Sequence, residues 1–184
     1  MRDYHDFLGE ILISEEQLQA RIAELGEQIS RDYAGEDLLL VCILRGGVLF
    51  LTDLMRQISV PHAIDFMSVS SYGIGARQRS GQARINLDIN TDIYNRNVLL
   101  VEDIVDSGYT LEAVLSLLRT RRPKTLRTCI LLDKAERREV DVPVDYCGFT
   151  IPNVFVFGYG LDIDEYYRNL PFIGIVDLEK YESP

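Results

Sequence analysis

The sequence predicts an α/β fold in which helices flank a parallel β-sheet. Apolar runs of strand length, such as residues 38–44, alternate along the chain with stretches whose apolar residues recur at helical spacing, such as residues 111–122. The apolar runs lack the alternation of a half-exposed strand, which is typical of strands that are covered on both faces. Strands of this kind that follow one another through helices pair in parallel, with right-handed crossovers.

A helix is expected at the start of the chain, over residues 15–33. Ser14 is followed three residues later by Gln17, which is the spacing of a capping box. The apolar residues that come next lie at helical spacing: Leu18, Ile22, Leu25 and Ile29.

The next elements begin with residues 38–44, which predict a fully buried strand that ends at Arg45-Gly46-Gly47. A helix over residues 48–58 and a strand over residues 63–70 follow. Residues 72–83 are rich in Gly, Ser and Arg and predict an exposed segment.

The second half of the chain repeats the same alternation. A strand is expected over residues 98–102, a helix over 111–122 that stops at Pro123, and a strand over 126–133. Shorter strands are expected at residues 144–149, 154–157 and 172–177.

Composition limits the class of protein and of partner. The 184 residues suit one well-packed domain, and 47% hydrophobic with 26% charged residues is typical of a globular protein. With 19 basic and 29 acidic residues the net charge is -10, which argues against nucleic acid and anionic membranes as partners. A polyanionic substrate must therefore meet a local basic cluster or a metal ion.

A cytoplasmic location is expected. The first residues lack the basic and then apolar order of a signal peptide, and the longest apolar run, residues 38–44, is too short to cross a bilayer. Cys42, Cys129 and Cys147 lie in apolar runs without CxxC spacing, which indicates small buried side chains in a reducing compartment.

Residues 98–110 carry the most specific pattern. Four apolar residues lead into Glu102 and Asp103, and a turn then opens the helix. Backbone N–H groups at such a turn form a cup that suits a phosphate, to which the hydroxyls of Ser107 and Thr110 add donors. Carboxylates beside a phosphate are costly unless they face sugar hydroxyls or a hard cation such as Mg²⁺. The run therefore predicts a sugar-phosphate site.

This run resembles the phosphoribosyl pyrophosphate (PRPP) motif of the type I phosphoribosyltransferases. Further motifs in the same order resemble the hypoxanthine-guanine members of that family: Leu44-Arg45-Gly46-Gly47, Ser71-Tyr72, Leu131-Leu132-Asp133-Lys134 and the stretch from Val154 to Asp162 with Arg168. The resemblance spans residues 38–177. It implies the type I phosphoribosyltransferase fold as a single domain, with a parallel core over about residues 36–150 and a hood made by the N-terminal segment and about residues 151–184.

The activity that the resemblance implies is purine salvage: transfer of the phosphoribosyl group from PRPP to hypoxanthine or guanine, which gives the nucleoside monophosphate and pyrophosphate. It assigns PRPP and its 5′-phosphate to Glu102, Asp103, Asp106, Ser107, Gly108, Tyr109 and Thr110. It assigns pyrophosphate to Arg45, Gly46 and Arg168, and the purine to Lys134, Phe155, Val156 and Asp162. Glu102, Asp103 and Asp162 are expected to hold Mg²⁺, and Ser71 and Tyr72 to start a lid.

Particular residues sharpen these expectations. Asp106, at the edge of the cup, is the best candidate to accept the purine N7 proton. An ammonium can only donate hydrogen bonds, so Lys134 favours a 6-oxopurine over adenine. Tyr109 stands where some family members carry Lys, which leaves the phosphate to backbone and hydroxyl donors. The family often has a cis peptide bond before the position of Arg45.

Each motif also has a purely structural explanation. Asp106 and Ser107 suit helix caps, Gly46 suits a strand-to-helix turn, Lys134 suits a solvated strand end, and Phe155 suits a core. Two other functions stay open: a xanthine-preferring enzyme, and an RNA-binding pyrimidine-operon regulator of the same fold, which the net charge disfavours. A homodimer or homotetramer is expected.

Overall fold

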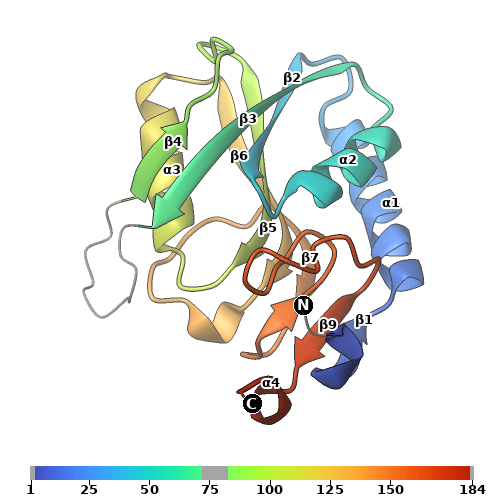
Figure 1. The fold of residues 1–184 in the computed structure, drawn as a ribbon. Coiled ribbons are helices and arrows are strands. Elements are labelled where there is room, and N and C mark those ends of the chain that lie inside the picture. Colours follow the sequence, from blue (N-terminus) through green and yellow to red (C-terminus); the bar gives the residue numbers. More distant parts are fainter. Residues whose placement is uncertain (1–2, 72–82, 183–184) are drawn as a thin grey trace.

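A computed structural model describes residues 3–71 and 83–182, and Figure 1 shows their arrangement. Six strands form the main sheet, in the order β4-β3-β2-β5-β6-β7. Their bounds are β2 Leu38–Leu44, β3 His62–Ser71, β4 Ala83–Leu87, β5 Asn97–Val105, β6 Thr125–Asp133 and β7 Tyr146–Thr150. All neighbours pair in parallel except β3 and β4. The predicted parallel α/β sheet is confirmed.

Three helices cover the two faces of this sheet: α1 Glu15–Asp32, α2 Val48–Gln57 and α3 Tyr109–Thr120. In Figure 1, α1 and α2 lie on one face of the sheet and α3 lies on the other. Apolar residues of α1 and α2 pack with Leu40 and Val101, and those of α3 pack with Val41 and Leu100. Successive strand residues thus point to opposite layers, which explains why β2 and β5 are apolar throughout.

A second sheet lies beside the carboxyl ends of the main strands. It has the order β1-β9-β8, with β1 Leu8–Ile13, β8 Val156–Phe157 and β9 Ile173–Val176, and all its pairs are antiparallel. The short helices η1 Tyr4–Asp6 and α4 Leu178–Glu182 flank it, and η2 Ala135–Arg137 follows β6. Phe7 and Phe157 are fully buried in the core of this small layer.

Several expected bounds need correction, among them the strands expected over 144–149 and 154–157, which begin two residues later at Tyr146 and Val156. The strand predicted to end at Glu102 continues to Val105, because β6 pairs with it as far as Asp133. The expected helix over residues 111–122 begins and ends two residues earlier, at Tyr109 and Thr120. Strands β1 and β4 were not predicted, and β4 begins at Ala83, the last residue of the segment expected to be exposed.

No helix within residues 3–71 and 83–182 is both long and apolar enough to cross a membrane. All three cysteines are free thiols, with Cys42 and Cys129 buried and Cys147 partly buried.

Candidate active site

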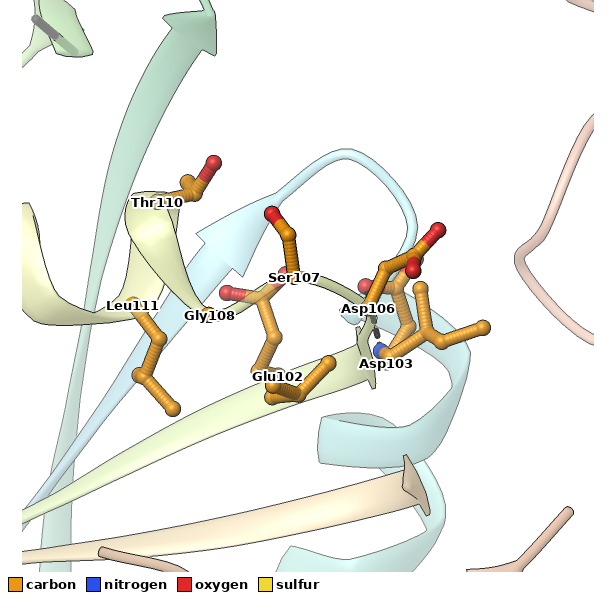
Figure 2. A pocket seen from close by; sticks show the side chains of 9 residues that line it. Glu102, Asp103, Asp106, Ser107, Gly108, Thr110 and Leu111 are labelled. Atoms are coloured by element: carbon orange, nitrogen blue, oxygen red, sulfur yellow. Dashed lines mark hydrogen bonds between the residues drawn. The ribbon is translucent and has the colours of Figure 1, made fainter. Parts of the chain in front are cut away.

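The turn between β5 and α3 lines a pocket of about 170 Å³. Its walls are Glu102, Asp103, Ile104, Val105, Asp106, Ser107, Gly108, Thr110 and Leu111. Figure 2 shows the hydroxyls of Ser107 and Thr110 on the same side of the turn. In this view Ser107 lies between Thr110 and the Asp106 carboxylate. The structure therefore brings the residues of the predicted phosphate cup around one pocket.

Unpaired backbone donors face the same turn. The first hydrogen bond of α3 runs from Glu112 N to Gly108 O, at 2.9 Å, so the N–H groups of Tyr109, Thr110 and Leu111 have no partner within the helix. Together with the helix dipole they favour an anion here. The side chain of Tyr109 points elsewhere, since its hydroxyl donates to Glu139 at 3.4 Å.

Gly108 makes this turn possible. Its φ is +93°, and a Cβ at this position would lie 2.8 Å from the carbonyl oxygen of Val140. Gly108 is also the N-cap of α3, and no side chain caps the helix. The alternative role of Asp106 and Ser107 as helix caps is therefore wrong.

Asp106 lies beside the end of β6. Its Oδ1 pairs with Arg137 Nε at 2.8 Å, and both side chains are partly exposed. The backbone N–H of Lys134 donates to Val105 O at 3.0 Å, which fixes the end of β6 against the pocket. Lys134 is only 8% exposed, and burial lowers the pKa of its ammonium, an effect that the charge of Asp106 opposes. Lys134 is thus not a solvated strand end.

Glu102 and Asp103 are consecutive residues of β5, and both line the pocket. The Oε2 of Glu102 is buried and accepts no hydrogen bond from any described residue. Burial, and then the neighbouring Asp103, raise the pKa of Glu102 well above its usual range, and burial also raises the pKa of Asp103. Glu102 thus has an acidic neighbour and almost no solvent to offset its charge, so its ionised form is disfavoured.

Asp103 packs against the loop that follows β2. Its Oδ1 accepts a hydrogen bond from Ile104 N at 2.9 Å, and a Cβ at Gly46 would lie only 1.5 Å from its Oδ2. A Cβ at Gly160 would in turn lie 2.0 Å from the carbonyl oxygen of Gly46. The peptide bond between Leu44 and Arg45 is cis, as the resemblance implied.

Arg168 and Asp162 complete this side of the site. Arg168 Nη1 donates to Gly160 O at 2.8 Å, and Nη2 pairs with Asp162 Oδ1 at 2.9 Å. The positive charge of Arg168 opposes the rise in the pKa of Asp103. Arg45 Nη2 pairs with Glu165 Oε1 at 2.9 Å. Three segments far apart in sequence therefore meet, and Glu165 is a member that sequence reasoning missed.

Two of the residues expected to bind the purine, Phe155 and Val156, lie at the start of β8. Phe155 is 48% exposed and is therefore not a core residue. Val156 pairs with Ile175 of β9, and the adjacent hydrogen bond runs from Val176 N to Phe155 O at 2.8 Å. In this register the N–H and C=O of Val156 face away from β9, on the free edge of the sheet.

Other expected site residues are less closely tied to the pocket. Ser71 is the last residue of β3, paired with Ala83 through the backbone, and Tyr72 lies outside the described residues.

Among residues 3–71 and 83–182, no three His, Cys, Asp or Glu side chains form a group that could hold a metal ion. Glu102, Asp103 and Asp162 therefore do not form a complete ligand set on their own.

Comparison with known proteins gives close relatives over nearly the whole chain. The family of the phosphoribosyl transferase domain matches residues 12–164. The hypoxanthine-guanine phosphoribosyltransferase of Mycobacterium bovis is 50% identical over 185 residues, which cover 97% of this chain and 91% of the relative. The hypoxanthine phosphoribosyltransferase of Escherichia coli is 50% identical over 171 residues, which cover 92% and 96%.

Solved structures of hypoxanthine phosphoribosyltransferases also match nearly the whole chain. A hypoxanthine phosphoribosyltransferase from Staphylococcus aureus superposes with a TM-score of 0.93 at 43% identity, covering 98% of this chain and 97% of that one. A variant hypoxanthine phosphoribosyltransferase from Trypanosoma cruzi, solved as a ternary complex with substrates, gives 0.89 at 43% identity and covers 95% and 98%.

Proposed function

The chain belongs to the hypoxanthine-guanine phosphoribosyltransferases, enzymes of purine salvage, and on that premise we propose that the pocket at the end of β5 binds the phosphoribosyl group of PRPP. One observation carries this proposal: unpaired N–H groups of α3 and two hydroxyls line the same pocket as Glu102 and Asp103. The donors suit the 5′-phosphate, and the carboxylates suit the ribose hydroxyls.

We assign the proton transfer to Asp106. In the reaction a bond forms between purine N9 and ribose C1′, the bond from C1′ to pyrophosphate breaks, and the purine loses its N7 proton. Asp106 lines the pocket and lies near Lys134, which supports its role as the acceptor of that proton. Its partner Arg137 keeps a positive charge 2.8 Å from the carboxylate before the purine arrives.

The proposed base site uses Lys134, Phe155 and Val156. Lys134 is buried and directly follows β6 beside the pocket, so the 6-oxo group of the purine would gain a hydrogen-bond donor there. The exposed ring of Phe155 offers a stacking surface, and the free backbone edge of Val156 offers a donor and an acceptor. This set favours hypoxanthine and guanine over adenine.

Pyrophosphate is assigned to Arg45, Gly46 and Arg168. Both guanidinium groups lie at one end of the Gly46 loop, where each contacts Glu165. The backbone of Gly46 packs closely against the Asp103 carboxylate. Charge-assisted hydrogen bonds from arginine suit phosphate oxygens. We propose further that Ser71 and Tyr72 begin a lid, which would keep water away from a cationic ribose.

We propose Mg²⁺ as the cofactor. The buried, unpartnered Oε2 of Glu102 and the raised pKa of both adjacent carboxyl groups fit a nearby cation, and oxygen is the ligand that Mg²⁺ prefers. Glu102 and Asp103 would hold it, with Asp162 on the pyrophosphate side. A bound Mg²⁺ would neutralise the leaving pyrophosphate.

Three further proposals complete the account. The small sheet β1-β9-β8, with about residues 151–184, acts as the hood over a core of about residues 36–150. A cytoplasmic location is supported by the three free thiols.

A homodimer or homotetramer is supported by the exposed apolar side chains of Ile64, Ile85 and Leu87 on β3 and β4. Light scattering would measure the molar mass of the assembly.

The experiment that tests the site is product formation from PRPP with hypoxanthine, guanine, xanthine and adenine, in wild type and in Asp106→Asn. The wild type should use hypoxanthine or guanine, and a preference for xanthine would identify the alternative enzyme. Asp106→Asn keeps the shape of the turn but weakens the acceptor, so kcat should fall about 10²-fold or more while PRPP binding changes little. Near-normal turnover in a folded variant would remove Asp106 from the reaction.

A further inference from the structure

Glu165 occupies the position between the two arginines that we assign to pyrophosphate. Its Oε1 pairs with Arg45 Nη2 at 2.9 Å, and its Oε2 pairs with Arg168 Nη2 at 3.3 Å. Each carboxylate oxygen thus takes one guanidinium group, in the way that two oxygens of a phosphate would.

The backbone around Glu165 holds it in this place. It lies in the turn between Asp162 and Arg168 with a φ of +73°, and its N–H donates to Asp162 Oδ2 at 2.8 Å. Arg168 is anchored independently of Glu165, through Gly160 O and Asp162 Oδ1. Losing the Glu165 carboxylate therefore leaves Arg168 in position.

The contact is nevertheless weak enough to be displaced. The side chains of Arg45 and Glu165 are 68% and 58% exposed, and exposed ion pairs of this kind stabilise little. Pyrophosphate carries several negative charges and more acceptor oxygens than one carboxylate, so it should displace Glu165 from the two arginines when it binds.

We propose that Glu165 is an internal competitor of pyrophosphate: it holds Arg45 and Arg168 in the free enzyme and is displaced by the diphosphate of PRPP or by the product. This inference rests on the assignment of the two arginines to pyrophosphate. Because the competitor is part of the chain, it lowers the affinity for the diphosphate and favours its release.

The test is the dissociation constant of inorganic pyrophosphate, measured by calorimetry at fixed MgCl₂, for wild type and Glu165→Gln. Glutamine keeps the size of the side chain and removes its charge. Affinity should rise about two- to tenfold, which is the range expected when the exposed pair with Arg45 and the partly exposed pair with Arg168 no longer compete. The Michaelis constant for PRPP should fall in parallel, and Glu165→Ala should shift both values in the same direction.

Glu27→Gln is the matched control, because it removes one negative charge from an exposed pair with Arg31 on α1, away from the site. It should leave pyrophosphate affinity unchanged. Unchanged affinity in Glu165→Gln would overturn the proposal, and weaker affinity would overturn it by showing that Glu165 only organises the arginines. A gain of equal size in both variants would also overturn it, as a general effect of charge.

Arg45→Ala separates this inference from the proposed function. If Arg45→Ala weakens pyrophosphate binding and Glu165→Gln fails to strengthen it, the competitor role is wrong and the pyrophosphate site stands. If Arg45→Ala leaves the affinity unchanged, the pyrophosphate site itself is wrong, and the competitor role falls with it.

Discussion

Glu102 is the residue at which stability and binding conflict most directly. Its Oε2 is buried and accepts no hydrogen bond from residues 3–71 or 83–182, and burial beside Asp103 raises the pKa of Glu102 well above the usual range. In the absence of ligand the ionised carboxylate therefore destabilises the fold, which is a cost that active sites often carry.

Glu102→Gln should stabilise the ligand-free protein at neutral pH. Removing an uncompensated buried charge is worth about 1–2 kcal/mol, which corresponds to a rise in Tm of about 2–8 °C for a chain of this size. Turnover should fall in the same variant, because we assign the carboxylate to the ribose and Mg²⁺ site. Thermal melting and a steady-state assay measure the two effects.

The stabilisation should depend on pH with a definite sign. A raised pKa means that folded Glu102 keeps its proton after the unfolded chain has lost it, so the wild type loses stability as pH rises from about 4.3 through the folded pKa. The Gln variant lacks this loss. The difference in Tm should be near zero at about pH 4 and grow toward pH 7, and an equal difference at both pH values would contradict the assigned cause.

We propose that Lys134 carries the specificity for the 6-oxo group. Lys134→Met keeps side-chain length and removes the donor, which should cost about 2–4 kcal/mol in kcat/KM for hypoxanthine and guanine. The ratio of kcat/KM for hypoxanthine or guanine to kcat/KM for adenine should therefore fall. Native discrimination in this variant would show that the 6-oxo group is read by another residue.

At the scale of elements, the Gly46 loop packs closely against the loop after β8, and we propose that this contact sets the geometry of the pyrophosphate site. Gly160 has a φ of +98°, and a Cβ there would lie 2.0 Å from Gly46 O, which is backbone and cannot rotate away. Substitution must therefore push the two loops apart.

Gly160→Ala should lower Tm and also reduce kcat/KM by about tenfold or more, because displacement of the order of 1 Å at a site is costly. Gly35→Ala is the matched control: its φ is +79°, and a Cβ there meets nothing within 4 Å. It carries the strain of a positive φ without a clash, so it should lower Tm and leave kcat/KM near the wild-type value. Equal activity losses in the two variants would refute the role of this contact.

The sequence predicted those elements whose signal is local. α1 has a capping box and regular apolar spacing, and β2 is an uninterrupted apolar run, so both were located within one residue. β1 and β4 are short and partly exposed, and they exist because β9 and β3 pair with them. The end of β5 depends likewise on β6, which explains why charged residues failed to mark it.

The candidate site also combines residues that have a local sequence signal with residues that only long-range packing brings together. The pocket from Glu102 to Leu111 is contiguous in sequence and could be predicted. The pairs of Glu165 with Arg45 and of Arg137 with Asp106 depend on long-range packing, and a lone charge in a polar stretch gives no signal for them. The contact of Gly160 with Gly46 also appears only in three dimensions.

For the whole molecule, the net charge of -10 opposes a highly anionic substrate. PRPP should therefore bind well only with Mg²⁺. At about 100 times its dissociation constant, PRPP with Mg²⁺ should stabilise the fold by about 2.7 kcal/mol, or raise Tm by about 5–11 °C. Excess EDTA should abolish both this shift and turnover, and Mg²⁺ or Mn²⁺ should restore them; full activity in EDTA would contradict the cofactor assignment.

The most direct test of the account is a crystal structure of the enzyme with bound inosine monophosphate. The phosphate should accept hydrogen bonds from the N–H groups at the start of α3 and from the hydroxyls of Ser107 and Thr110. The base should then lie on Phe155 with its 6-oxo group at Lys134. A phosphate bound away from the turn between β5 and α3, or a 6-oxo group far from Lys134, would contradict the central claim.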